Sequence, residues 1–356
     1  MKNRQILLII LIIGLLISAC TSSAQPAKET NINNATEAPT KPFKVCQVVA
    51  EGGVSDKSFN QMGWEGTQKA AKDFGIEASY LVTKQNSDYE ANTAACIAEG
   101  ADLVITTGFR SAPAALASAD GNPQQKYAII DNTGEGKPNV LGNTTRMDQT
   151  CFLAGYLSAA MSKTGKVGTF VGQLAPATQA FVDGFYMGIK YYNESKGANV
   201  QLIGYDPEKK EETAQIGNFQ DQDAGKNLTL SFMDEGVDII LPVAGSVSIG
   251  TASALVERGE GCMIGVDRDW FVSNPEYADH ILASVVKRVD VFSYEAIKQV
   301  LDGTFKGGDY VGTLENGGTN LAYGGAKCAV DVTPELKAEI DELAKKVISG
   351  ELKTIP

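Results

Sequence analysis

Histidine is almost absent from this chain of 356 residues, and His280 is the only one. Its scarcity weakens any hydrolase mechanism that depends on a histidine base, and it weakens most histidine-rich metal sites. The chain also has no GxSxG nucleophile elbow and no GxxxxGK[ST] phosphate-binding loop. We therefore expect a protein that is not an enzyme and that carries no cofactor or metal.

Long apolar runs are also scarce, and the clearest one lies at the N-terminus. Residues 6–17 are almost wholly aliphatic, interrupted by Gly14, and they follow Lys2 and Arg4. The run is about a dozen residues long, shorter than the roughly 20 that a spanning helix needs. A basic start, a short apolar run and the small residues Ser18 and Ala19 are typical of a secretory signal peptide. We predict a signal peptide at residues 1–19.

The residue after this segment is a cysteine. Residues 17–20, Ile-Ser-Ala-Cys, resemble the lipobox of bacterial lipoproteins, which implies that Cys20 takes a diacylglycerol and becomes the new N-terminus. Each buried CH₂ of an acyl chain adds about 0.8 kcal/mol, so two or three chains hold a protein at the membrane. The rest of residues 20–42 is polar and small, as expected of a flexible linker. We expect a lipid-anchored protein on the extracytoplasmic face of the cell membrane; a plain secretory peptide is the alternative.

Positive charge is in deficit, since the formal net charge is −12. Removal of residues 1–19 with Lys2 and Arg4 would make it −14. Nucleic-acid binding needs clustered Lys and Arg, so this balance argues against a nucleic-acid partner. It does not argue against a neutral small ligand.

The cysteines show no CxxC pair and no metal-binding spacing. An exported chain can form disulfides, and two bridges would leave one thiol beyond Cys20. Cys46 lies on a predicted strand and Cys96 near the end of a predicted helix, so these two are candidate neighbours. Buried free thiols are the alternative. The connectivity stays open among five cysteines: Cys46, Cys96, Cys151, Cys262 and Cys328.

From residue 43 onward, strand-like runs alternate with helix-like runs, which predicts an α/β fold with parallel sheets. The rhythm restarts after residue 150, so we predict two similar doubly wound lobes. The predicted strands are 44–50, 78–82, 103–105, 127–130, 167–171, 200–204, 237–241, 263–266 and 281–286. The predicted helices are 56–75, 89–99, 112–119, 150–161, 179–192, 224–234, 248–258, 292–301 and 336–348.

The loops after several strands carry glycine, aromatic and acidic residues. In open α/β sheets, ligands bind outside the carboxyl ends of the strands. Two lobes that face each other through those ends would form a cleft. Glycine lets the backbone approach a ligand, aromatic rings offer flat apolar faces, and Asp and Asn make directional polar contacts.

The loop SDKSFNQ at residues 55–61 resembles the signature of the basic membrane protein lipoproteins, the purine nucleoside receptor type of solute-binding protein. Shorter matches follow in the same order along nearly all of the chain from residue 43. They are TGF (107–109), ID (130–131), FLAGY (152–156), GKVG (165–168), FVDGF (181–185), GVD (265–267), SVVK (284–287) and ENGG (315–318).

The resemblance implies a type I periplasmic-binding-protein fold with a three-segment hinge. Lobe 1 would contain residues 43–146 and 284–313, and lobe 2 residues 147–283 and 314–356. The chain would cross between them near 143–148, 284 and 314. The implied function is capture of a purine nucleoside and its delivery to the permease of an ABC importer, by a chain that we expect to be a monomer.

The resemblance also implies a stacking site. Phe59 would stack on one face of the base, with Phe181 of the second lobe on the other, and Asn60 and Asp131 would contact the base edge. The alternatives are core packing for either ring and a turn or capping role for Asp131.

The remaining implied contacts concern the ribose. Asp267 would accept bonds from its hydroxyls, Lys287 would donate to them, and the backbone at Gly108 and Gly245 would line it. Lys287 has the alternative of a solvated surface charge. Asp56 would contact the ligand or cap the helix that starts there, and we favour the cap.

Three features depart from the family pattern: Arg110 in place of a further aromatic residue, a loop at 244–250 with fewer glycines, and Trp270 after the acidic pair. They leave the ligand less certain than the fold. A same-fold binding protein for a sugar or signalling molecule is one alternative. An adhesin or sensor partner and an enzyme acting on nucleosides are two others.

Overall fold

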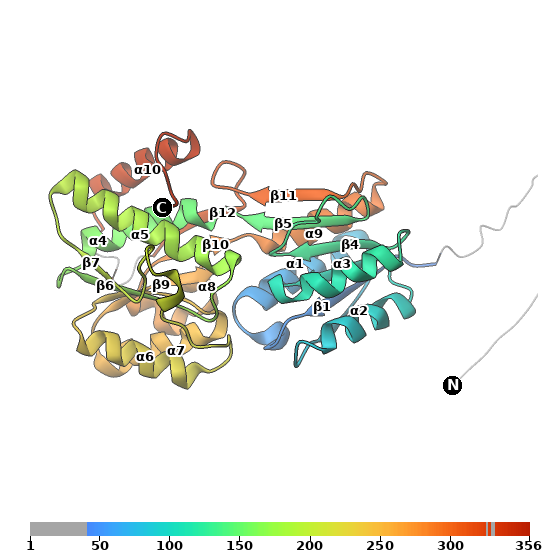
Figure 1. Cartoon of the computed structure of the whole chain (residues 1–356), viewed down its shortest axis with the longest axis horizontal. Coiled ribbons are helices and arrows are strands. Elements are labelled where there is room, and N and C mark those ends of the chain that lie inside the picture. The colour runs from blue at the N-terminus through green and yellow to red at the C-terminus, as the bar shows by residue number, and fades with distance from the viewer. Residues whose placement is uncertain (1–40, 325–326, 329–331) are drawn as a thin grey trace, which may run out of the picture. The chain divides into compact units, whose positions relative to one another are not determined.

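Two six-stranded sheets organise the computed structural model, which describes residues 41–324, 327–328 and 332–356 (Figure 1). The predicted signal peptide, Cys20 and nearly all of the predicted linker lie outside the described residues. The order in sheet A is β11-β5-β4-β3-β1-β2, and in sheet B it is β12-β10-β9-β8-β6-β7. Sheet A comprises β1 (Lys44–Val49), β2 (Glu77–Val82), β3 (Leu103–Thr107), β4 (Lys126–Ile130), β5 (Val140–Thr145) and β11 (Gly308–Gly312). Sheet B comprises β6 (Lys166–Val171), β7 (Gln201–Ile203), β8 (Ile239–Val243), β9 (Cys262–Asp267), β10 (Ile281–Lys287) and β12 (Thr319–Tyr323).

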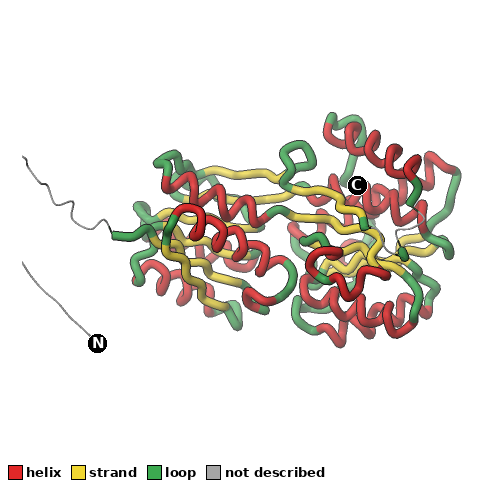
Figure 2. Tube along the Cα trace, turned by 180° about the vertical axis from the view of Figure 1, so that it is seen from behind, coloured by secondary structure: helices red, strands yellow, loops and turns green. Residues whose placement is uncertain are grey.

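Helices cover both faces of each sheet, and the predicted α/β class is confirmed. We call sheet A with its helices lobe 1 and sheet B with its helices lobe 2. Lobe 1 carries α1 (Phe59–Phe74), α2 (Asp88–Ala98), α3 (Ala112–Gly121) and α9 (Val289–Leu301). Lobe 2 carries α4 (Met147–Met161), α5 (Pro176–Lys196), α6 (Gln222–Asp234), α7 (Ser248–Arg258), α8 (Trp270–Ser273) and α10 (Pro334–Ile348). Figure 2 shows the same alternation of helix and strand from behind.

The central strands are buried on both faces, which explains their continuous apolar runs. All five residues of β3 are buried. Leu103 and Ile105 pack with α1 and α9 on one face, whereas Val104 packs with α2 and α3 on the other. Because side chains alternate along a strand, the single apolar run of β3 contributes to the hydrophobic cores on both faces of the sheet.

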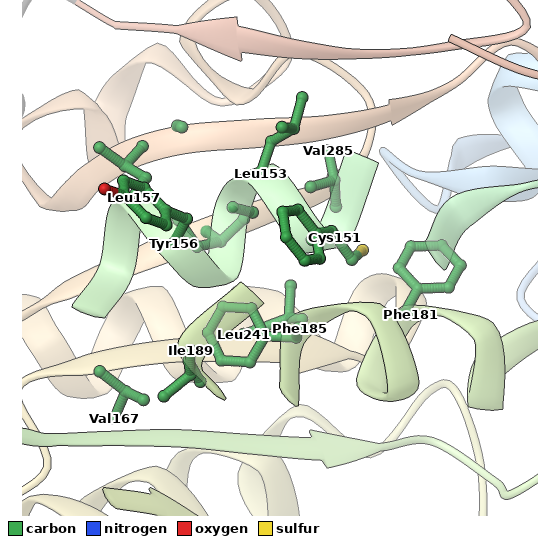
Figure 3. Packing of buried hydrophobic residues seen from close by; sticks show 14 of the residues in the cluster. Cys151, Leu153, Tyr156, Leu157, Val167, Phe181, Phe185, Ile189, Leu241 and Val285 are labelled. Carbon is green, nitrogen blue, oxygen red and sulfur yellow. The ribbon is translucent and has the colours of Figure 1, made fainter. Parts of the chain in front are cut away.

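The largest core of lobe 2 lies where α4 and α5 pack together beside sheet B. Leu153 and Tyr156 of α4, Phe185 and Ile189 of α5, and Leu241 of β8 belong to one buried cluster (Figure 3). Burial of a large apolar side chain contributes about 1.5–3 kcal/mol. This cluster therefore holds the helix that leaves lobe 1 firmly in lobe 2.

The chain crosses between the lobes where three strands end. After β5 it enters lobe 2 as α4, after β10 it returns to lobe 1 as α9, and β11 and β12 belong to different sheets. The second crossing follows Lys287, because β10 pairs with sheet B up to that residue. This is three residues later than the predicted position of 284.

The sequence prediction did not include β5, β11 and β12, the strands beside the crossings. It also started the first helix at Asp56, whereas α1 begins at Phe59 after a 3₁₀ turn at Gly53–Ser55. β11 reads Gly-Asp-Tyr-Val-Gly, with little apolar content to mark it as a strand. It pairs in parallel with β5, so the partner strand defines it.

Two disulfides join neighbouring elements. Cys46 of β1 is bonded to Cys96 of α2, as we considered from the sequence, and Cys262 is bonded to Cys328. Cys151 is a buried free thiol. Over the described ranges, the helices include none with the length and apolar content needed to cross a membrane.

Candidate functional site

A cavity lies between the lobes, at the carboxyl ends of the strands. Loops after β1, β3 and β4 line it from lobe 1, and the ends of β8, β9 and β10 line it from lobe 2. Its volume is about 90 Å³, whereas roughly 10–15 Å³ holds one water molecule. The space therefore suits a small organic molecule.

All nine residues that the sequence singled out as ligand contacts line this one cavity. They come from separate parts of the chain, some from loops at the carboxyl ends of parallel strands and some from the helices α1 and α5. They are Asp56, Phe59, Asn60, Gly108, Asp131, Phe181, Gly245, Asp267 and Lys287.

A buried ion pair joins the two lobes at the cavity wall. Lys287 Nζ, at the end of β10, lies 2.5 Å from Asp131 Oδ1, which follows β4. Their side chains are only 4% and 9% exposed, so Lys287 is no solvated surface charge. A buried charge without such a partner would cost several kcal/mol, so the two opposite charges offset each other's burial.

Asp131 and Asp267 occupy matching places in the two lobes. Each stands at the carboxyl end of the third strand of its sheet, counted from β11 or from β12. Both have left-handed backbones, with φ of 69° and 66°. Such a conformation costs an L-residue roughly 1–2 kcal/mol, and Asp tolerates it better than most. The repeated geometry aims one carboxylate from each lobe into the cavity.

Asp267 is the more isolated of the two carboxylates. Ser58 Oγ, from lobe 1, donates to Asp267 Oδ2 at 2.7 Å. Burial raises the pKa of Asp267 to about 6, and the charge on Lys287 and the Ser58 bond only partly oppose this. The group therefore accepts hydrogen bonds readily near neutral pH and gains from any further donor.

Asp56 lines the cavity, but its oxygens are already occupied. Its carboxylate accepts the backbone N–H groups of Ser58, Asn60 and Gln61 at 2.9–3.0 Å. Ser58 is the N-cap residue of α1, and Asn60 and Gln61 carry free donors in its first turn, so the capping interpretation is confirmed. Burial nevertheless raises the pKa of Asp56, and these three bonds counteract it.

Asn60 presents an unused acceptor. Its Nδ2 donates to the carbonyl oxygen of Glu51 at 3.0 Å, while its Oδ1 is buried and has no hydrogen-bond partner in the structure. An unsatisfied buried acceptor costs about 1–3 kcal/mol. A ligand N–H or O–H that reached this oxygen would recover that cost.

Aromatic rings surround the amine of Lys287. Its Nζ lies 5.1 Å from the ring centroid of Phe59 and 5.6 Å from that of Phe181, within the range of cation–π attraction. Phe109 and Phe219 also line the cavity, with their centroids 6.5 Å apart. The walls are thus apolar and flat, with charged groups at fixed points.

Sequence reasoning missed part of the wall. Trp270, which it noted, is buried outside the cavity and donates Nε1–H to the carbonyl oxygen of Val266. The missed residues share no motif, and only Arg110 was marked, as a departure from the family pattern. They include Glu51, Tyr89, Arg110, Phe219 and Gln220. Phe219 lies in an irregular segment that follows no strand, so the rule of strand ends gave no signal for it.

This arrangement defines a class of protein. Two α/β lobes joined by three crossings, with a cavity between their strand ends, are the architecture of bilobed solute-binding proteins. Among residues 41–324, 327–328 and 332–356, no three or more His, Cys, Asp or Glu side chains are grouped to hold a metal ion.

Comparison with known proteins identifies the family. Residues 43–354 match the family described as ABC transporter substrate-binding protein PnrA-like, so the chain belongs to the basic membrane protein family. This confirms the resemblance carried by the loop motifs. The family is one of substrate-binding proteins.

Individual relatives agree with this assignment. The chain is 30% identical to basic membrane protein A of Borreliella burgdorferi, over 98% of this chain and 95% of the relative. It is 28% identical to an uncharacterized lipoprotein of Pyrococcus horikoshii, over 88% of this chain and 84% of the relative. A solved structure of an ABC transporter solute-binding protein from Aeropyrum pernix is 28% identical and superposes with a TM-score of 0.77, over 88% of this chain and 93% of that one.

Proposed function

We propose that the chain captures a purine nucleoside between its lobes and delivers it to the permease of an ABC importer. The observation that carries this proposal is the convergence of the nine predicted contacts on one cavity between the lobes. Family membership supports solute binding for import. The choice of ligand rests on the chemistry of the wall.

The wall favours an uncharged molecule with a flat apolar part and several polar hydrogens. Lys287 is balanced by Asp131, so the pair attracts neither sign of charge strongly. Phe59 and Phe181, the two rings proposed to stack on the base, both line the cavity together with Phe219, and base–aromatic stacking contributes about 1–3 kcal/mol per base. Asp267 and Asn60 Oδ1 offer acceptors, which suit ribose hydroxyls and a base N–H. A purine nucleoside combines these features.

Binding would couple to lobe closure. Contacts from lobe 1 and lobe 2 can be made together only in a closed form, so a ligand shifts the population toward it. The closed form would then dock on the permease, and the chain itself would catalyse no reaction. In this proposal the diacylglycerol on Cys20 keeps the protein beside the permease on the extracytoplasmic face.

Isothermal titration with inosine, guanosine and adenosine tests the ligand, with ribose as the comparison. We expect saturable binding of at least one nucleoside by the chain from residue 20, carrying Cys20→Ala. Binding of ribose without any nucleoside would select the sugar-binding alternative. Mass spectrometry of the ligand that stays bound through a gentle purification gives an independent answer, because the ligand need not be chosen beforehand.

Two substitutions at Phe59 separate stacking from packing. Phe59→Ala removes ring and volume, whereas Phe59→Leu keeps apolar volume and removes only the ring. If Phe59 stacks on the base, both variants should weaken nucleoside binding tenfold or more. Near-normal affinity in Phe59→Leu would assign the ring to core packing instead.

The lipid anchor has its own test. Cys20→Ala should abolish metabolic labelling with a radioactive fatty acid and release the chain from washed membranes. Cys151→Ala is the matched control, since Cys151 is buried in the core of lobe 2. A Cys20→Ala chain that still takes up the label would refute the anchor.

A further inference from the structure

One arginine ties the two lobes together at the edge of the cavity. Arg110 follows β3 in lobe 1, and its Nη1 donates to Glu51 Oε2 at 2.6 Å within that lobe. Its Nε donates across the cleft to Gln173 Oε1 of lobe 2 at 3.1 Å, and its Nη2 donates to the same oxygen. Charge-assisted bonds of this kind are about twice as strong as neutral ones.

The same arginine separates the cavity from the protein surface. Arg110 lines the cavity, and it also lines two more open grooves beside it. Glu51 and Gln220 are shared between the cavity and the first groove, which continues over residues 82–86 and 217–218. Tyr89 is shared with the second groove. Arg110 and Glu51 therefore stand between the cavity and the first groove, and Gln173 holds the guanidinium from the other lobe.

The wall is also connected to a second cavity-lining segment. Gln173 Nε2 donates to the carbonyl oxygen of Gly217 at 2.6 Å. The segment from Gly217 continues to Phe219 and Gln220, whose side chains line the cavity. A rotation of Arg110 away from Gln173 would break the contact across the cleft and open the cavity toward the first groove.

Another ion pair between the lobes provides a contrast. Lys57 Nζ of lobe 1 lies 3.0 Å from Glu276 Oε1 of lobe 2, and these side chains are 50% and 47% exposed. Neither lines the cavity or its grooves. The side chains of Arg110 and Glu51 are each only 20% exposed. Lys57 thus forms an ion pair between the lobes but takes no part in the barrier at Arg110.

We propose that Arg110, held by Glu51 and Gln173, is the gate of the ligand cavity, and that it sets both the length of ligand accepted and the rate of its release. This rests on the proposed function, since the gated ligand is the nucleoside. With Arg110 in place, the cavity ends at the guanidinium, and a ligand with a bulky extension cannot fit. Without it, the first groove becomes a continuation of the cavity.

The test compares Arg110→Met, which keeps an unbranched stem but loses the charged head, with the control Lys57→Met. Stopped-flow displacement gives the release rate of the best-binding nucleoside. Titration gives the affinity for that nucleoside and for two benzyl-extended analogues, one extended on the base and one on the 5′ oxygen. Arg110→Met should release the nucleoside at least tenfold faster. For at least one analogue, the ratio of its affinity to that of the nucleoside should be at least tenfold higher in Arg110→Met than in the unmodified chain.

Lys57→Met should change both quantities less than twofold, and Glu51→Gln should act in the same direction as Arg110→Met. The relative affinity is decisive, because general loosening of the closed form would weaken all ligands alike. An unchanged ratio in Arg110→Met overturns the gate, whatever the release rate. An unmodified chain that binds no nucleoside overturns the proposed function and the gate with it.

Discussion

Charged side chains at the site lower the stability of the fold, because burying them costs free energy. Three residues show this: Asp131, Asp267 and Lys287. All three are buried at the meeting of the lobes, where removal from water disfavours charge. Lys287 and Asp131 compensate each other, and Ser58 gives Asp267 one donor. The carboxylate of Asp267 can accept more hydrogen bonds than the protein donates to it, as expected of a ligand-binding group.

Asp267→Asn should stabilise the ligand-free chain at pH 7.5 while weakening nucleoside binding. The folded pKa is about 6, raised by burial, against an ordinary pKa of 3.8 for an aspartate. Between these values the unfolded chain has ionised and the folded chain keeps its proton, so stability falls as pH rises from about 4 to 6 and stays low above. The difference corresponds to at most about 3 kcal/mol.

Urea unfolding at pH 5 and pH 7.5 measures the stability, and titration calorimetry measures the binding. Glu260→Gln, at an exposed turn, is the control and should change neither. If Asp267→Asn is no more stable than the unmodified chain at pH 7.5, the buried carboxylate carries no such cost.

At the scale of elements, the two lobes repeat one device at their crossings. Arg146 follows β5 and forms paired bonds with Asp148, and Arg288 follows β10 and forms paired bonds with Asp290. Each crossing helix then packs on a helix of the lobe that it enters, α4 on α5 in lobe 2 and α9 on α1 in lobe 1. At two of the three crossings, therefore, the hinge has the same construction: a strand of one lobe leads through an Arg–Asp pair into a helix of the other.

Close packing of these helices depends on glycine. A Cβ atom at Gly188 of α5 would overlap the backbone oxygen of Phe152 in α4. At Gly121, which ends α3, an added Cβ atom would meet nothing within 4 Å. The two sites therefore separate the effect of helix contact from that of helix propensity.

Gly188→Ala should lower the free energy of unfolding by about 1–3 kcal/mol or more, because the helices must move apart. Gly121→Ala should leave it unchanged or raise it by up to about 1 kcal/mol, because alanine is the better helix former. Chemical unfolding of both variants checks this. Equal changes in the free energy of unfolding would mean that α4 and α5 can move apart at little cost.

The packed elements could be predicted from the sequence better than the hinge strands. Long helices such as α5 show their apolar face at helical spacing, and buried strands such as β3 show continuous apolar runs. The sequence of β5, Val-Leu-Gly-Asn-Thr-Thr, has neither pattern over its full length. It is a strand because β4 and β11 flank it, which is information about distant segments.

For the whole molecule, lobe closure rests on contacts that span the cleft. Ser58 bonds to Asp267, and Arg268 of lobe 2 lies 3.0 Å from Glu65 of lobe 1. The buried Lys287–Asp131 pair also joins the lobes, whereas the exposed Lys57–Glu276 pair contributes only about 0–1 kcal/mol. A ligand that touches both lobes can then decide the equilibrium.

Small-angle X-ray scattering should detect this closure. A saturating nucleoside should reduce the radius of gyration of the unmodified chain, and Asp267→Asn should respond only at much higher ligand concentrations. Identical scattering with and without bound ligand would contradict closure by population shift.

Thiol counting tests the covalent state of the mature chain. Unfolded without reductant, the protein should expose one reactive thiol, Cys151, because four cysteines are in disulfides and the proposed diacylglycerol would block the sulfur of Cys20. Before unfolding it should react slowly, since burial holds the pKa of Cys151 well above its usual value. A second thiol would indicate an unmodified Cys20, and three or more would mean that a disulfide is missing.

Local patterns in the sequence were enough to predict the α/β class, the family and the loop residues that meet in the cavity, whereas the lipid on Cys20 stays a prediction. These patterns are periodicity, strand-end chemistry and motifs in order. Two facts came from the folded molecule alone: Lys287 pairs with Asp131, and Arg110 stands between the cavity and the surface. Each depends on which side chains become neighbours and on how far water is excluded from them, and neither can be read from spacing along the chain.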